Sequence, residues 1–207
     1  MAVFAFLAKW DLDKQNELDE RVETRVEQKK QQKQAAKGMK EREKLLGTLK
    51  LAIRVSADGA TREAAVKELQ AGARQHMIVV AGPKKACRDA LVGANLLKMD
   101  FAMSNVLVVP YEMGVDEAEQ MSRPDGSGFG ESLPIYETQP YVAKPVGEGW
   151  DEYIKQEMDD AVKQNGENAK TEGIAVVVAS NGSVIRRGVG KVPWRQMVEQ
   201  LDEAVKA

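Results

Sequence analysis

The chain of 207 residues has little of the chemistry that builds disulfide scaffolds or metal sites. It contains one cysteine, Cys87, and one histidine, His76. A single cysteine cannot form an intrachain disulfide, and a structural zinc site takes about four Cys or His ligands. The formal net charge is −2, from 30 basic and 32 acidic residues, and the lack of a basic excess argues against a general nucleic-acid binder. We expect neither a bound metal nor a cofactor.

No apolar run is long enough to cross a bilayer, which takes about 20 residues. The chain nevertheless opens with a short apolar run from Met1 to Ala8, followed by Lys9 and Trp10. Tryptophan and lysine at this place are typical of the headgroup level of a membrane, which favours the end of a membrane or membrane-interface helix over residues 1–10. The alternative is an N-terminal helix that docks on the core.

Residues 11–46 hold no proline and a single glycine, Gly38, and good helix formers dominate. Leu18, Val22 and Val26 make only a thin apolar stripe, so a helix here can bury little of its surface. The first half is mainly acidic and the second half mainly basic. The pattern predicts a long, charged helical stalk, with a spacer role favoured over a specific partner site.

Apolar runs alternate with helical patterns over residues 49–207, which we expect to form one domain. Strands are predicted at 49–55, 76–81, 105–109, 173–179 and 183–187, and helices begin near Thr61, Pro83, Trp150 and Pro193. Asn181 and Gly182 form a strong hairpin signal between the last two strands. Because helices link the first strands, those strands should be parallel. The sequence therefore predicts an α/β fold, a mixed sheet with helices on both faces.

The segment 112–149 does not fit this alternation and is rich in proline. A connection of this length without regular structure is uncommon in a compact domain. Its aromatic residues Phe129, Tyr136 and Tyr141 are of the type that anchors protein interfaces, and we expect them to bind a protein partner. The alternative is an extended cover that packs on the domain itself.

The order of the elements resembles that of thioredoxin, and so does the ending from Gly173 onward. Thioredoxins carry Cys-Gly-Pro-Cys between the second strand and the second helix, where this chain has Ala81-Gly82-Pro83-Lys84. Dithiol exchange needs an attacking thiolate and a resolving thiol, which alanine and lysine cannot supply. The cis-proline of that family also has no counterpart at 173–175. We therefore expect a redox-inactive thioredoxin-like domain that is not an enzyme and has no catalytic residues.

Cys87 is the remaining candidate for thiol chemistry. It falls with Leu91 and Ala94 on the apolar stripe of its predicted helix, so we expect it to be buried and inert. Lys84, Lys85 and the helix dipole favour a thiolate nearby, which leaves a one-cysteine redox enzyme as an alternative. Lys84 and Lys85 are also candidate partner-binding residues.

Two other groups of polar residues are expected to be structural. The loop 188–191 lacks the further residues of known phosphate-binding loops and is interpreted as a turn before Pro193. A set of carboxylates falls on one predicted helix without an opposing partner, so we expect them on its solvated face. They are Asp151, Glu152, Glu157, Asp159 and Asp160.

Four stretches, residues 53–59, 77–83, 106–111 and 173–194, carry a more particular resemblance. Together they resemble the soluble part of the low photosystem II accumulation family of chloroplasts and cyanobacteria. The resemblance implies a thylakoid-membrane protein that assists photosystem assembly, with membrane helices ahead of a domain that faces the stroma. Residues 1–10 match the exit from the second membrane helix. Protein subunits of a photosynthetic membrane complex are the implied partners.

From these observations we expect a non-catalytic assembly or scaffold protein that acts through protein contacts. One alternative is a permanent accessory subunit of a photosystem complex, in which the stalk and the segment 112–149 wrap neighbouring subunits. The other is a one-cysteine redox enzyme that uses Cys87.

Overall fold

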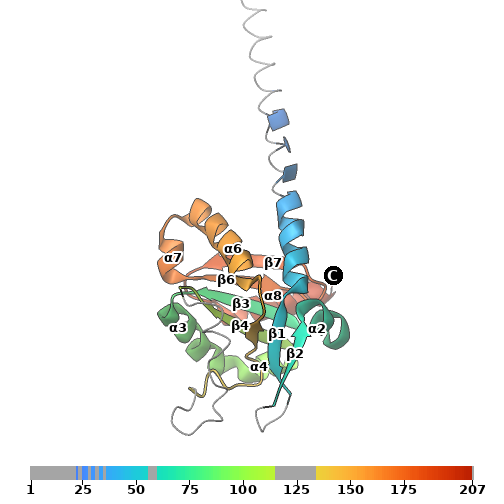
Figure 1. Ribbon diagram of the computed structural model, residues 1–207, viewed down its shortest axis with the longest axis vertical. Helices are drawn as coiled ribbons and strands as arrows, with labels where there is room; N and C mark the ends of the chain where they lie inside the picture. The colour runs from blue at the N-terminus through green and yellow to red at the C-terminus, as the bar shows by residue number, and fades with distance from the viewer. Residues whose placement is uncertain are drawn as a thin grey trace, which may run out of the picture. The chain divides into compact units, whose positions relative to one another are not determined.

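The computed structural model describes residues 22, 25–27, 29–30, 33–34, 36–55, 60–114 and 134–206 (Figure 1). The chain divides into two compact units, Met1–Arg42 and Glu43–Ala207. In the first unit the described residues are helical, and Val22 and Val26 are exposed. The predictions for residues 1–10 and for Phe129 lie outside the described residues. None of the described helices is long and apolar enough to span a membrane.

The second unit begins at Glu43, ahead of the predicted domain start at residue 49. The reason is Leu46, which is 1% exposed and packs in the same core as Leu49 and Leu51. Residues 43–48 are helical. Because Leu46 on this turn is buried in the core, the turn belongs to the domain rather than to the stalk.

A small antiparallel sheet opens the domain, in the order β2–β1–β5. It comprises β1 (Lys50–Arg54), β2 (Thr61–Ala65) and β5 (Lys144–Val146). The prediction that Thr61 begins a helix is wrong: Thr61 lies in β2, and the helix that follows is α2 (Val66–Ala73). The N–H of Val55 donates to the carbonyl of Ala60 at 2.9 Å and closes the β1–β2 hairpin, so strand pairing outweighs local helix preference.

The main sheet has four strands in the order β4–β3–β6–β7. They are β3 (His76–Gly82), β4 (Val106–Glu112), β6 (Ile174–Val178) and β7 (Val184–Val189). Strands β3 and β4 are parallel, whereas β6 is antiparallel to both β3 and β7. The predicted mixed sheet is confirmed. The prediction that the first strand runs parallel to its successors is wrong, because β1 belongs to the other sheet.

Helices cover both faces of the main sheet, and alternate residues of β3 show this directly. Met77 and Val79 pack in the core that contains α6 (Trp150–Asn165) and β1, whereas Ile78 and Val80 face the other core. That second core is closed by α3 (Lys84–Ala94), η1 (Asn95–Leu97), α4 (Lys98–Met103) and α8 (Trp194–Lys206). A short helix, α7 (Asn168–Glu172), leads into β6. This arrangement is thioredoxin-like, as predicted.

The described part of the segment 112–149 packs on the domain. Val142 forms a parallel bridge with Val108, and β5 pairs with β1. The ring of Tyr141 lies 5.0 Å from that of Phe101, centroid to centroid. For residues 134–149 the structure therefore corresponds to the extended cover, while 115–133 lie outside the described residues.

Candidate partner-binding site at the start of helix α3

The candidate site lies where the central strand β3 passes into α3. Every residue of β3 is buried, as expected for a strand in the middle of a doubly covered sheet. Pro83 stands at the N-cap with φ −62°, a backbone angle that proline adopts without cost before a helix. Ala81 to Lys84 thus occupy the junction at which thioredoxins carry their cysteines, as predicted.

Two glycines allow the backbone to approach itself closely at this junction. A Cβ on Gly82 would lie 2.8 Å from the Cα of Gly173, and one on Gly173 would lie 2.9 Å from the carbonyl oxygen of Ala81. Gly173 also has φ +81°, which L-residues with a side chain rarely adopt. No cis peptide bond occurs in the described part of the chain. Residues 173–175, which correspond to the cis-proline of thioredoxins, therefore have only trans peptide bonds.

Cys87 lies one turn into α3 and is 2% exposed, which confirms its predicted place in the core. Its Sγ is 3.3 Å from the carbonyl oxygen of Tyr111 and 3.5 Å from that of Gly82. Burial, together with the negative charge of Glu112, raises the pKa of the thiol to about 12. The thiol is therefore protonated at neutral pH, and the lysines at the start of α3 do not reverse this.

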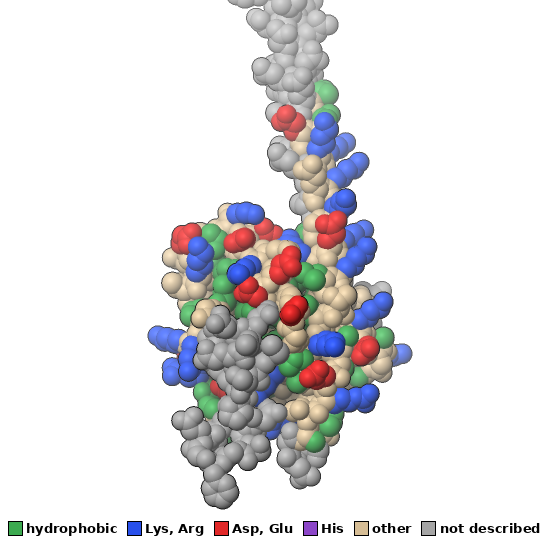
Figure 2. All heavy atoms as spheres, in the orientation of Figure 1, with side chains coloured by type: hydrophobic (Ala, Val, Ile, Leu, Met, Phe, Trp, Pro, Cys, Tyr) green, Lys and Arg blue, Asp and Glu red, His purple; other side chains and the backbone are tan. Residues whose placement is uncertain are grey.

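A pocket of about 90 Å³ opens beside Cys87, between α3, the end of β4 and the segment before β5. Lys84, Arg88 and Lys144 supply positive charge to its wall, and Leu91 and Val142 supply apolar surface. Glu112, Glu137, Pro110, Pro145 and Tyr136 complete the lining. In Figure 2, basic side chains gather at the edge of the domain formed by α3, where Lys84, Lys85 and Arg88 are exposed.

The predicted partner-binding residues are only partly brought together. Lys84 and Tyr136 line the same pocket, whereas Lys85 lines a separate one of about 610 Å³. That second pocket is bounded by Asp89, Glu172, Gly173, Lys191 and Trp194, among others. Tyr141 is 6% exposed, and its ring serves the core rather than the surface.

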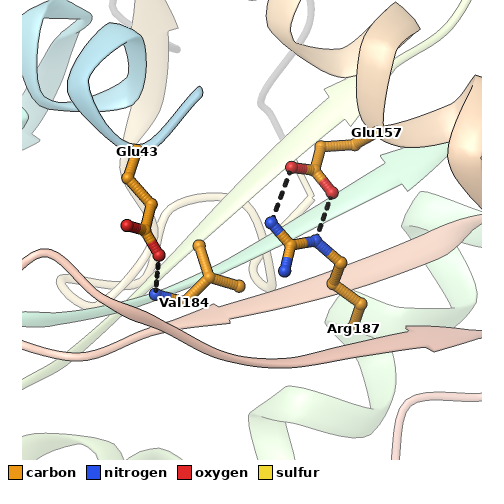
Figure 3. Close-up of polar contacts among 4 residues, drawn as sticks. All are labelled: Glu43, Glu157, Val184 and Arg187. Atoms are coloured by element: carbon orange, nitrogen blue, oxygen red, sulfur yellow. Dashed lines mark hydrogen bonds and ion pairs between the residues drawn. The ribbon is translucent and has the colours of Figure 1, made fainter. Parts of the chain in front are cut away.

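The prediction that Glu157 lies on the solvated face of its helix is wrong. Its side chain is 1% exposed and makes a two-point ion pair with Arg187, with N–O distances of 2.6 and 3.1 Å (Figure 3). Desolvation lowers the pKa of Arg187, but the hydrogen bond and the charge of Glu157 outweigh it and raise that pKa. Nearby, Glu43 accepts a hydrogen bond from the backbone N–H of Val184 at 3.1 Å.

A signal for this pair was present in the sequence. Glu157 falls three residues after Ile154 and four after Tyr153, both buried, and such positions share one helix face. A carboxylate on a buried stripe needs a cationic partner, which Arg187 supplies from β7. In the described residues no cluster of His, Cys, Asp and Glu could hold a metal ion.

Comparisons with known proteins find neither a matching family model nor a matching curated protein. Among solved structures, the mitochondrial 2-Cys peroxiredoxin of Plasmodium falciparum is 10% identical, covering 76% of this chain and 89% of that chain, with a TM-score of 0.44. AhpC of Mycobacterium tuberculosis is 9% identical, covering 77% and 92%, with a TM-score of 0.41. The exposed lipoprotein thioredoxin of Streptococcus pneumoniae is 11% identical, covering 74% and 97%, with a TM-score of 0.40. At such identities the likeness concerns the fold alone.

These comparisons contradict the expectation that the chain is not an enzyme. The similar structures include peroxiredoxins, which are enzymes.

Proposed function

We propose that this protein assists the assembly of a photosynthetic membrane complex at the chloroplast thylakoid, with its domain in the stroma, and that it acts by binding protein subunits at the start of α3. The resemblance of four sequence stretches to the low photosystem II accumulation family supports the role. The observation that carries the binding surface is the pocket of about 90 Å³ walled by Lys84, Arg88 and Lys144.

The size of this pocket favours a protein partner over a small-molecule ligand. Pockets for small molecules enclose about 300–1,000 Å³, whereas this one is suited to a single side chain. Three cations line the pocket against two carboxylates, Glu112 and Glu137, and this excess of one positive charge favours an acidic partner segment. The first turn of α3 contains no acidic residue, so the positive end of the helix dipole adds to their field.

Charge reversal tests the proposal. The double variant Lys84→Glu/Arg88→Glu should lose about tenfold or more of its crosslinking to photosystem subunits in isolated thylakoid membranes, because paired charge reversals at an interface repel the partner. Lys67→Glu, an exposed lysine on α2, is the matched control and should crosslink as the original chain does. Equal crosslinking by all three proteins would contradict the proposal. Co-purification in a one-to-one ratio with the mature complex would instead assign a permanent subunit.

One-cysteine redox chemistry is the second candidate, and the observation that favours it is that Cys87 lines the same pocket. Because the pKa of Cys87 is raised, we expect its thiol to react slowly in the folded protein. At pH 7.5 a thiol reagent should label the folded protein about 100-fold more slowly than the urea-unfolded chain, because the thiolate is the reactive form. Equal labelling rates in the two states would favour the redox candidate.

A further inference from the structure

Exposed apolar side chains gather at one place on the domain surface. Of the ten large hydrophobic side chains that are exposed in the described part of the chain, four fall within residues 92–103. They are Val92 in α3, Leu96 in η1, and Met99 and Met103 in α4. Single exposed apolar residues are normal on a protein surface, whereas a cluster of them marks an interaction surface.

Met99 and Met103 lie on the side of α4 that faces away from the core. Phe101 is 1% exposed and packs in the second core, so the positions two residues before and two residues after it fall on the opposite side of the helix. Leu96 comes three residues before Met99 and extends this side by about one turn. Leu96, Met99 and Met103 are 87%, 66% and 82% exposed, and we call these three residues the α4 patch.

Two charged side chains of opposite sign flank the α4 patch. Lys98 and Asp100 are the sequence neighbours of Met99, and at about 100° per residue they stand on its two sides. Both are exposed, and neither has an ion-pair partner within the described part of the chain. Such a surface is complementary to itself about a two-fold axis that runs alongside the helix. That axis brings the Lys98 side of one copy against the Asp100 side of the other.

The size of the α4 patch agrees with a reversible dimer. Together with the aliphatic parts of Lys98 and Asp100, the patch covers about 500–600 Å² per copy, the size of the larger apolar patches on soluble proteins. Two copies would bury about 1,000–1,200 Å² in total, which lies at the lower limit of specific protein interfaces. Methionine side chains are flexible and adapt their shape, so two identical patches can pack against each other.

We propose that the α4 patch binds a second copy of this chain, in a two-fold dimer with Met99 beside the axis. Each Lys98 then pairs with Asp100 of the partner subunit, and the apolar side chains of the two patches cover one another. A strongly acidic partner or an anionic membrane would be attracted by one flank of the patch and repelled by the other, whereas a second copy satisfies both flanks. This inference does not rest on the function proposed above.

Sedimentation equilibrium of the full chain tests the dimer. We expect the weight-average mass to rise from 22.8 kDa toward twice that value between about 1 μM and about 1 mM protein. Met99→Lys should weaken the association at least about tenfold, because two lysines then meet beside the axis. Ile135→Lys, at an apolar position that is 75% exposed elsewhere on the domain, is the matched control and should associate as the original chain does. A monomer at every concentration, or equal association of the Met99→Lys variant, would overturn the proposal.

Charge-swap variants test the two-fold arrangement itself. Lys98→Asp makes both flanks negative and Asp100→Lys makes both flanks positive, so each variant alone should associate about tenfold more weakly than the original chain. The double variant Lys98→Asp/Asp100→Lys should associate as the original chain does, because the flanks are complementary again. An equimolar mixture of the two single variants should form a heterodimer for the same reason. Thermal unfolding of each variant verifies that the fold is kept.

Two outcomes would contradict this arrangement. If neither the double variant nor the mixture restores the association, Lys98 and Asp100 do not meet across a two-fold axis. If the chain stays monomeric but binds phosphatidylcholine vesicles, and Met99→Lys abolishes that binding, the α4 patch faces a membrane surface rather than a second copy.

Discussion

The surroundings of Cys87 make the stability of the folded protein depend on pH. The pKa of Cys87 is about 12 in the folded protein, compared with 9.0 for a free thiol. Between pH 9 and 12 the unfolded chain has lost a proton that the folded chain keeps, so this group makes the folded state less stable as pH rises through that window. Below pH 9 both states bind the proton and the contribution is constant.

Cys87→Ser removes that titration and provides the test. At pH 8 the variant should be less stable by about 1 kcal/mol, as is usual for a modest core change. The difference from the original chain should change sign at pH 10.5, measured by urea unfolding at both pH values, because the original chain loses about 1.4 kcal/mol for each pH unit above 9. A difference that is the same at both would show that the thiol has no raised pKa.

The buried ion pair between Glu157 and Arg187 is a second prediction at this scale. Glu157→Ala leaves the guanidinium partly buried without its partner, and we expect a loss of about 3 kcal/mol in the free energy of unfolding. The exposed neighbour Asp159 is the matched control, and Asp159→Ala should change stability by less than about 0.5 kcal/mol. The double variant Glu157→Leu/Arg187→Met should be more stable than Glu157→Ala, because it leaves no buried charge. Urea unfolding of the three variants checks this order.

At the scale of elements, the contact between the β3–α3 junction and the start of β6 depends on glycine. Gly173→Ala adds a Cβ at φ +81° and 2.9 Å from the carbonyl oxygen of Ala81. Gly166 has a similar φ of +78°, but a Cβ there meets nothing within 4 Å, so Gly166→Ala isolates the cost of the backbone angle. We expect about 1 kcal/mol for Gly166→Ala and at least about 2 kcal/mol more for Gly173→Ala. Equal losses in thermal unfolding would mean that the close approach relaxes freely.

At the scale of the whole molecule, the domain should fold without the first unit. Residues 43–207 contain both hydrophobic cores, so deleting 1–42 should leave a single cooperative thermal transition. Deleting 1–48 removes the buried side chain of Leu46 and should lower stability by about 2–3 kcal/mol relative to the shorter deletion. If both deletions unfold at the same temperature, Leu46 does not belong to the core.

Much of the candidate site was predictable because the residues involved are close together in sequence. The buried run of β3, the Gly82–Pro83 turn and the stripe through Cys87 locate the strand–helix junction and the missing dithiol. The other walls of the adjoining pocket come from β4, from β5 and from the segment before it, and no local pattern indicates that Lys144 of β5 lines the same pocket as Lys84 and Arg88. The sequence therefore indicated the centre of the site but not its perimeter.

The sequence by itself determined the elements whose periodicity has one physical solution. Continuous apolar runs at β3 and β6 are stable only inside a sheet covered on both faces, and the Asn181–Gly182 turn joins β6 to β7 as predicted. The tertiary structure decided the identity of β2, the pairing of β5 and the burial of Glu157. The pairing of β5 with β1 and the burial of Glu157 against Arg187 depend on partners far along the chain, whose hydrogen bonds compensate for a desolvated backbone or charge. The strand β2 pairs with its neighbour β1, and this pairing prevails over a local helix preference. Periodicity within a short window cannot report such a partner, because backbone pairing and desolvation act between segments brought together only by folding.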